Sequence, residues 1–299
     1  MRAGGRDPVA DRHLCRAAGG LFREAAALTP DLNSPIGIFD SGMGGLTVMA
    51  AIRRRLPDEA LVYLGDTARL PYGTKSADTV TRYALQAAGA LLRFDIKLLV
   101  VACNTASAAA LPALREMLAP LPVVGVIEPG AAAAVSAVPA GPIAVIATEG
   151  TVRGGAYVQA IQALSPAMPV VQAPAPLFVG LAEEGLTGGP IAEAVAARYL
   201  GPLLDTVPRP RGLVLGCTHF PVLKDTIAKV AGPDVTLIDS AETAAVRVEE
   251  VLKEKGLLNP GPPAAPKFLA TDAPGRFAHL GEIFLGEPID PGAVALVDL

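Results

Sequence analysis

Short, uninterrupted apolar runs recur along the chain, with helical segments between them. The first half carries such runs at 36–39, 61–64, 96–102 and 122–127, and the second half at 142–147, 169–172, 212–216 and 235–238. Runs of this kind are typical of parallel strands that are covered on both faces. The helical segments lie at 45–56, 76–92, 106–118, 154–164, 190–204, 221–231 and 241–255. This alternation predicts an α/β fold with doubly wound parallel sheets.

The two halves also match one another at the ends of their strands. Asp40 and Thr148 follow the first strand of each half, and Cys103 and Cys217 follow the third. With a further match after the fourth strands, the offsets between the halves are 108, 114 and 111 residues. Ligands of open α/β sheets bind beyond the carboxyl ends of the strands. We therefore expect two pseudo-symmetric domains with the active site in the cleft between them.

The match between the halves sets the expected domain boundaries. The first domain is predicted to comprise 34–128 plus 237–299, because the tail is expected to return to the first half. The second domain is predicted to comprise 129–236. Residues 1–33 lack an apolar signal core, so we expect a poorly structured N-terminal extension rather than a secretory signal.

Composition excludes several classes of partner. The net charge of −4 and the absence of Trp argue against a nucleic-acid or anionic-membrane partner. The uncharged stretches 98–114 and 129–148 are interrupted by polar residues or prolines, so they are interpreted as a buried strand plus helix. Three cysteines without a close pair predict neither a disulfide scaffold nor a metal site, and they suit the reducing cytoplasm. The sequence leaves both a monomer and a homodimer open.

Cys103 and Cys217 are the strongest candidates for chemistry. Cys103 lies in VVACNTAS and Cys217 in LVLGCTHFP, and each follows a strand and precedes a helix. The N-terminus of a helix favours a thiolate through its partial positive charge and free N–H groups. The alternative is that each cysteine is a small buried hydrophobe. Matching positions in a repeat argue against that alternative.

Polar groups accompany both cysteines in the sequence. His219 follows Cys217 closely enough to set its protonation, although it could instead be a helix-start histidine bonded to solvent. Asp40 lies in the glycine-rich turn GIFDSGMGGLTV, which offers free N–H groups to an anion. The segment LPYGTKS adds N–H groups and the Tyr72 hydroxyl, and LFVGLAEEG adds Glu183 and Glu184, unless these carboxylates are a solvated helix face.

Taken together, five segments resemble the cofactor-independent glutamate racemases of the aspartate/glutamate racemase superfamily. They are GIFDSGMGGLTV (37–48), YLGDTARLPYGTKS (63–76), VVACNTASA (100–108), LFVGLAEEG (177–185) and LGCTHFP (215–221). The resemblance covers about 36 to 255. The chain departs from the usual pattern in its extension and in 173–176 (APAP), where an Ala stands in place of an expected Cys.

The resemblance implies a two-base mechanism without a cofactor. One thiolate removes the α-proton of glutamate and the opposite thiol delivers a proton to the other face, with Cys103 acting on the D-enantiomer and Cys217 on the L-enantiomer. Asp40 would assist Cys103, while Glu183 and His219 would assist Cys217. The residues implied to bind the substrate are Asp40, Ser41, Tyr72, Gly73, Asn104, Thr105, Thr218 and His219, with Thr148 and Thr151 as further candidates. The product, D-glutamate, would supply peptidoglycan synthesis.

Three alternatives remain open at this stage. One is another member of the superfamily, such as an aspartate or hydantoin racemase or a single-thiol decarboxylase. A second is a catalytically silent amino-acid-binding protein, against which the presence of two thiols argues. A third is a Cys–His hydrolase built on Cys217 alone, although the short spacing to His219 favours a supporting role for the histidine.

Overall fold

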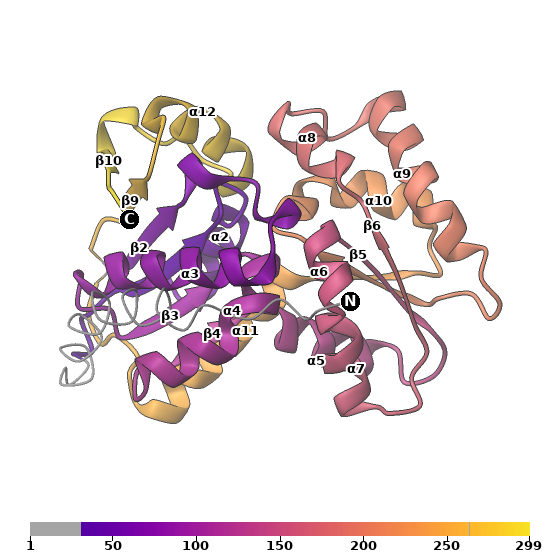
Figure 1. The fold of residues 1–299 in the computed structure, drawn as a ribbon, viewed down its shortest axis with the longest axis horizontal. Helices are drawn as coiled ribbons and strands as arrows, with labels where there is room; N and C mark the ends of the chain where they lie inside the picture. The colour runs from indigo at the N-terminus through magenta and orange to yellow at the C-terminus, as the bar shows by residue number, and fades with distance from the viewer. Residues whose placement is uncertain (1–30, 263) are drawn as a thin grey trace, which may run out of the picture.

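A computed structural model describes residues 31–262 and 264–299, so nearly all of the predicted extension 1–33 lies outside the described residues. The described chain forms two parallel sheets, one in each lobe of Figure 1. The first has the order β10-β9-β2-β1-β3-β4, with β1 (Ile36–Asp40), β2 (Leu61–Gly65), β3 (Leu98–Val101), β4 (Val123–Gly125), β9 (Lys267–Ala270) and β10 (Val294–Leu296). The second has the order β6-β5-β7-β8, with β5 (Ile143–Ala147), β6 (Val170–Pro174), β7 (Gly212–Gly216) and β8 (Thr236–Asp239).

The strand order of the second sheet repeats that of the first. In both sheets the first strand of the half lies between the second and the third, and the fourth lies outside the third. Every pairing among the described strands is parallel. The prediction of two pseudo-symmetric parallel-sheet units is therefore confirmed.

Helices flank both sheets. They are α2 (Leu46–Arg55), α3 (Ala77–Leu92), α4 (Asn104–Leu118), α5 (Ile127–Ala137), α6 (Glu149–Gly154), α7 (Ala156–Leu164), α8 (Leu177–Glu183), α9 (Gly189–Leu204), α10 (Lys224–Ala231), α11 (Ser240–Lys255) and α12 (Pro274–Leu285). Short 3-10 turns are η1 (Thr67–Arg69), η2 (Tyr72–Thr74), η3 (Phe220–Leu223) and η4 (Pro291–Ala293). The helix predicted at 154–164 is interrupted at Gly155, whose φ of 65° ends α6 before α7 begins. The sequence did not predict β9, α12 or β10.

Each half lends a helix to the other half. Helix α5 follows β4 of the first sheet but packs against α7, β7 and β8 of the second. Helix α11 follows β8 of the second sheet but packs chiefly against α2 of the first. The two exchanged helices also contact each other, so they form the junction between the lobes.

The apolar core follows this exchange. One buried cluster runs through both halves, from β1, α2 and α11 to α9 and α10. A second cluster fills the opposite face of the first sheet under α3 and α4, and a third lies between the second sheet and α5 and α7. Both sheets are thus covered on two faces, as their apolar runs require.

The tail beyond α11 adds β9 and β10 to the edge of the first sheet next to β2. Strand β8, by contrast, pairs with β7 in the second sheet, so the sheet changes after Asp239 rather than at 237. The division into domains at 128 and 237 stays a prediction. Among the described residues, no helix is both long and apolar enough to cross a membrane.

Candidate active site

The Cys103 thiol lies at the start of a helix, as its sequence context predicts. Cys103 is the N-cap of α4, and its sulfur accepts a hydrogen bond from the Ala106 N–H at 3.5 Å. The thiol also donates to the Ser41 hydroxyl at 3.6 Å. The side chain is 5% exposed. Its sulfur is therefore held between the turn after β1 and the first turn of α4.

Asp40 ends β1 and is fully buried beside this turn. One carboxylate oxygen, Oδ2, accepts the Gly42 N–H at 3.0 Å, whereas Oδ1 has no hydrogen-bond partner within the described part of the chain. Burial raises the pKa of Asp40, and the nearby charge of His219 opposes that shift. A buried acceptor without a donor is costly, so Oδ1 is suited to receive a proton or a ligand N–H.

Cys217 is the counterpart of Cys103 at the end of β7. Its sulfur lies 3.9 Å from His219 Nδ1, and His219 Nε2 lies 3.2 Å from Glu183 Oε1. Glu183 is the last residue of α8. The structure thus places His219 between Cys217 and Glu183, so that the carboxylate orients the imidazole and the imidazole faces the thiol.

The two thiols differ in electrostatic surroundings. Burial and the adjacent Asp40 charge raise the pKa of the Cys103 thiol to about 12. Burial alone would lower the pKa of His219, but hydrogen bonds to Cys217 and Glu183 raise it to about 10. The hydrogen bond from His219 lowers the pKa of Glu183. At neutral pH, Cys103 thus lies beside a carboxyl group and Cys217 beside an imidazolium.

Hydroxyl groups from both halves meet at the N-terminus of α4. Thr105 Oγ1 lies 2.9 Å from Thr148 Oγ1 and 3.3 Å from Thr151 Oγ1. Asn104 donates through Nδ2 to the Tyr157 hydroxyl at 2.9 Å, and its buried Oδ1 has no partner among the residues that the structure describes. Thr148 and Thr151 of the second half are therefore next to Thr105 of the first.

Tyr72 and Gly73 lie on η2, but the Tyr72 hydroxyl is already engaged. It donates to Asp66 Oδ2, whose carboxylate also accepts from Arg69 Nε at 2.7 Å and from Thr271 Oγ1 at 3.0 Å. Burial and the Asp66 carboxylate raise the pKa of Tyr72. The hydrogen of this hydroxyl is therefore engaged by Asp66, whereas its oxygen can still accept a hydrogen bond, and the predicted contact of Tyr72 with a ligand stays a prediction.

The Glu183–His219 pair has two neighbours that the sequence did not indicate. Both come from α12, in the tail that returns to the first half. Arg276 lies 3.7 Å from Glu183 Oε2, and the Phe284 ring meets the His219 ring edge to face at a centroid distance of 5.0 Å. Nothing in the short segment around α12 signals these contacts, because they depend on how the tail folds back.

Comparison with known proteins agrees with this geometry. Residues 37–248 match the family described as Asp/Glu/Hydantoin racemase. The chain belongs to this racemase family. The glutamate racemase of Geobacter metallireducens is 51% identical over 256 residues, which are 84% of this chain and 92% of the relative. With relatives of this kind, the chain is an amino-acid racemase, an isomerase.

Solved structures of racemases have the same fold. The glutamate racemase isoform RacE1 of Bacillus anthracis superposes with a TM-score of 0.85 at 39% identity, covering 90% of this chain and 99% of that one. The Francisella tularensis glutamate racemase, solved in complex with D-glutamate, gives a TM-score of 0.83 at 38% identity, covering 90% and 98%.

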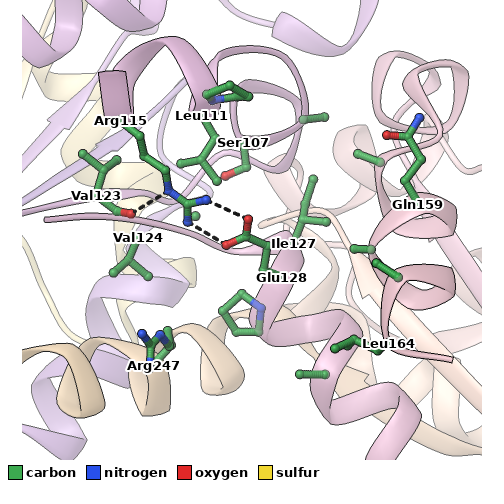
Figure 2. Close-up of a pocket in the computed structure, with 18 of the residues that line it drawn as sticks. Ser107, Leu111, Arg115, Val123, Val124, Ile127, Glu128, Gln159, Leu164 and Arg247 are labelled. Atoms are coloured by element: carbon green, nitrogen blue, oxygen red, sulfur yellow. Dashed lines mark hydrogen bonds and ion pairs between the residues drawn. The ribbon is translucent and has the colours of Figure 1, made fainter. Parts of the chain in front are cut away.

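A cavity of about 690 Å³ in this racemase lies apart from the thiols, between α4, α5 and α7. Figure 2 shows Arg115 across it, paired through two hydrogen bonds of 2.7 and 2.6 Å with Glu128. Arg115 Nε also donates to the Val123 carbonyl at 3.3 Å. None of the predicted site residues lines this cavity.

Proposed function

We propose that the protein interconverts L-glutamate and D-glutamate with two thiols and no cofactor. The observation that carries this proposal is the pairing of each buried thiol with a different proton-handling group, Asp40 for Cys103 and His219 for Cys217. Inversion of a carbon without a cofactor needs a base on one face and an acid on the other. Binding alone would need neither thiol.

Starting from L-glutamate, the Cys217 thiolate removes the α-proton and becomes a thiol. The electron pair left on the carbon then takes a proton from the Cys103 thiol on the opposite face, which leaves D-glutamate and a Cys103 thiolate. D-glutamate follows the same steps in reverse. After each turnover in one direction, a proton must pass from Cys217 to Cys103 before the cycle can repeat. His219 and Asp40 lie beside the two sulfurs and are placed to relay it.

The positive charge of the substrate would favour the thiolate form of Cys103. In the free enzyme, burial and the Asp40 charge hold the pKa of Cys103 at about 12, which disfavours the thiolate. An α-ammonium group could donate to the buried acceptors Asp40 Oδ1 and Asn104 Oδ1 that lack partners in the described chain. A cation bound there stabilises a neighbouring thiolate. The amino acid would thus help to ionise the group that attacks it.

The remaining predicted residues would hold the two carboxylates of the substrate. The candidates are Ser41, Tyr72, Gly73, Thr105, Thr148, Thr151 and Thr218, with the N–H groups of Tyr72 and Gly73 available as backbone donors. The Escherichia coli glutamate racemase, 31% identical with a TM-score of 0.69, was solved with L-glutamate and the activator UDP-MurNAc-ala. That relative supports a small-molecule substrate. The D-glutamate made by this chain would then supply peptidoglycan synthesis. The cytoplasmic location and the oligomeric state stay predictions.

The test is exchange of the α-hydrogen in heavy water. Either enantiomer of glutamate, incubated without any added cofactor, should gain deuterium at the α-carbon and lose optical activity. L-aspartate and D-aspartate, treated alongside, should react far more slowly. Turnover of aspartate in preference to glutamate would reassign the substrate, and a requirement for pyridoxal phosphate would rule out the two-thiol mechanism.

A further inference from the structure

Two adjacent glycines contact the helper groups of the two thiols, which are His219 for Cys217 and Asp40 for Cys103. A Cβ added at Gly44 would lie 2.4 Å from His219 Nδ1 and 2.6 Å from Thr218 Oγ1. A Cβ added at Gly45 would lie 2.5 Å from Asp40 Cβ. The turn after β1 is thus seated between Asp40 of its own half and His219 of the other half, with no room for a side chain.

A hydroxyl group fastens this turn to the opposite half. Thr47 Oγ1, in the first turn of α2, lies 2.9 Å from the Gly44 carbonyl and 3.0 Å from the Thr218 carbonyl. It is buried, with 7% of the residue exposed. Its single hydrogen is shared between two carbonyls that are far apart in sequence, one on each catalytic turn. The Thr218 carbonyl immediately precedes His219 in the chain.

We propose that Thr47 and Gly44 are positioning residues that hold the Thr218–His219 turn of the second half so that His219 Nδ1 faces the Cys217 sulfur. Neither residue touches the reacting atoms. Gly44 lets the two turns approach to contact, and the Thr47 hydroxyl fixes their separation. The inference rests on the proposed racemase function for its kinetic consequence, but the placement of His219 is a property of the free protein.

These contacts between the Gly44 turn and the Thr218–His219 turn, here called the interlock, explain why the His219 ring keeps its orientation. The bond from Glu183 fixes only Nε2, and it comes from α8 of the same half. The Nδ1 side of the ring is limited by the backbone of Gly44 and by the Thr218 hydroxyl, whose Oγ1 lies 3.4 Å from Nδ1. Loss of the Thr47 hydroxyl would leave the buried Thr218 carbonyl without that donor and let the turn move. A displacement of about 1 Å at a catalytic group can cost on the order of a hundredfold in rate.

The decisive variant is Thr47→Val, which keeps the shape and removes the hydroxyl, with Thr47→Ser as the variant that keeps it. Thr226→Val is the matched control, since Thr226 is about equally buried near the start of α10 and donates to the Thr187 carbonyl at 2.6 Å, which belongs to neither catalytic turn. We expect kcat for glutamate to fall about ten- to hundredfold in Thr47→Val. The kcat of Thr47→Ser should stay within about threefold of the wild-type value, and the kcat of Thr226→Val should equal the wild-type value.

A second readout does not depend on activity. NMR titration of the His219 ring, assigned with a His219→Asn variant, should give a pKa near the wild-type value in Thr226→Val and Thr47→Ser. In Thr47→Val it should fall by about one unit or more, because the ring loses its fixed partner at Cys217. Gly44→Ala should act in the same direction as Thr47→Val, with Gly201→Ala, where a Cβ meets open space, as its control.

The proposal is wrong if Thr47→Val leaves both kcat and the His219 titration unchanged, or if Thr47→Ser loses as much as Thr47→Val. Should Thr47→Val fail to fold, Gly44→Ala carries the same two measurements. A wild-type protein that does not racemise glutamate would overturn the proposed function instead. The titration of His219 would still decide whether the interlock positions the ring.

Discussion

The two thiols occupy equivalent places in a repeated unit but have unlike neighbours. Cys103 caps α4 next to Ser41 and a buried carboxyl group, whereas Cys217 faces an imidazole backed by a carboxylate. The repeat therefore places each thiol at the end of a parallel strand, whereas the turns around each thiol determine which charged groups lie next to it. A near-symmetric site can therefore handle mirror-image substrates with two chemically distinct proton relays.

Thermodynamics limits how this asymmetry can be seen. The two enantiomers have equal free energy in water, so kcat/KM must be equal in the two directions for every variant. A defect on one side appears instead in the split between kcat and KM and in isotope effects. Deuterium at the α-carbon slows only the step in which that hydrogen is removed, so it reports which thiol is the slow base.

Removing a thiol should have the largest effect. Cys217→Ser and Cys103→Ser should each lower racemisation by about 10³-fold or more, since an alcohol is a far weaker acid than a thiol. With Cys103 intact, Cys217→Ser should still exchange the α-hydrogen of D-glutamate in heavy water faster than it inverts it. Full two-way racemisation by Cys217→Ser would refute the assignment of two thiols.

Removing the helper groups His219 and Asp40 should have the next largest effect on kcat, and it should distinguish proton removal by Cys217 from proton removal by Cys103. We expect His219→Asn and Asp40→Asn each to lower kcat by about 10- to 10²-fold. The α-deuterium isotope effect should rise with L-glutamate in His219→Asn and with D-glutamate in Asp40→Asn. Isotope effects that rise equally for both enantiomers in both variants would show that the helpers are not tied to one thiol each.

Glu183→Gln should have a smaller effect of the same kind as His219→Asn. The amide still orients the ring but no longer carries the charge that supports the imidazolium, so kcat should fall about three- to tenfold. The pKa of His219 should fall toward its ordinary value, as measured by NMR titration. An unchanged titration would mean that Cys217 alone maintains the imidazolium.

The raised pKa of His219 also predicts how stability depends on pH. Its value of about 10 in the folded state exceeds the ordinary 6.5, so the folded protein binds the extra proton. That stability is fully present below the unfolded value and is lost as pH rises from about 6.5 through 10. Urea unfolding at pH 7 and pH 9.5 should show a steeper loss for wild type than for His219→Asn. Parallel losses would contradict a charged His219.

Arg276→Ala should have the smallest effect. Arg276 is largely exposed and lies 3.7 Å from Glu183, which makes it a weak ion pair in water. We expect a change in kcat of less than about twofold at moderate salt. A larger loss, measured against the neighbouring surface variant Glu282→Ala, would mean that α12 takes part in orienting Glu183.

The sequence was informative where the chain repeats itself. Eight strands and both thiols could be placed because short apolar runs end at matched positions, and parallel strands bring those ends to one edge. The line from Glu183 to His219 came from the resemblance to known racemases, because periodicity does not tell which loop faces which. The binding role of Tyr72 stays a prediction, and the sequence did not indicate that Asp66, buried at the end of β2, accepts the hydrogen of the Tyr72 hydroxyl.

The tail could not be predicted for a different reason. Strands β9 and β10 have four and three residues, and they have no counterpart in the second half. Their place at the sheet edge is set by pairing with β2, which is a contact between distant parts of the chain. Arg276 and Phe284 reach the Cys217 side only because of that pairing. The hydrogen bond from the Thr47 hydroxyl to the Thr218 carbonyl joins residues 171 positions apart, so it could not be predicted from the sequence either.

The exchange of α5 and α11 bears on how the molecule folds. Because the helix after β4 covers the second sheet and the helix after β8 covers the first half, the second sheet needs a helix from the first half, and the α2 side of the first half is not fully covered until α11 has been made. A fragment that ended before β5 would lack α11 and so expose the apolar side of α2 that α11 covers, and exposed apolar surface of that kind promotes aggregation. The racemase should therefore melt in one cooperative transition, with its two lobes gained and lost together.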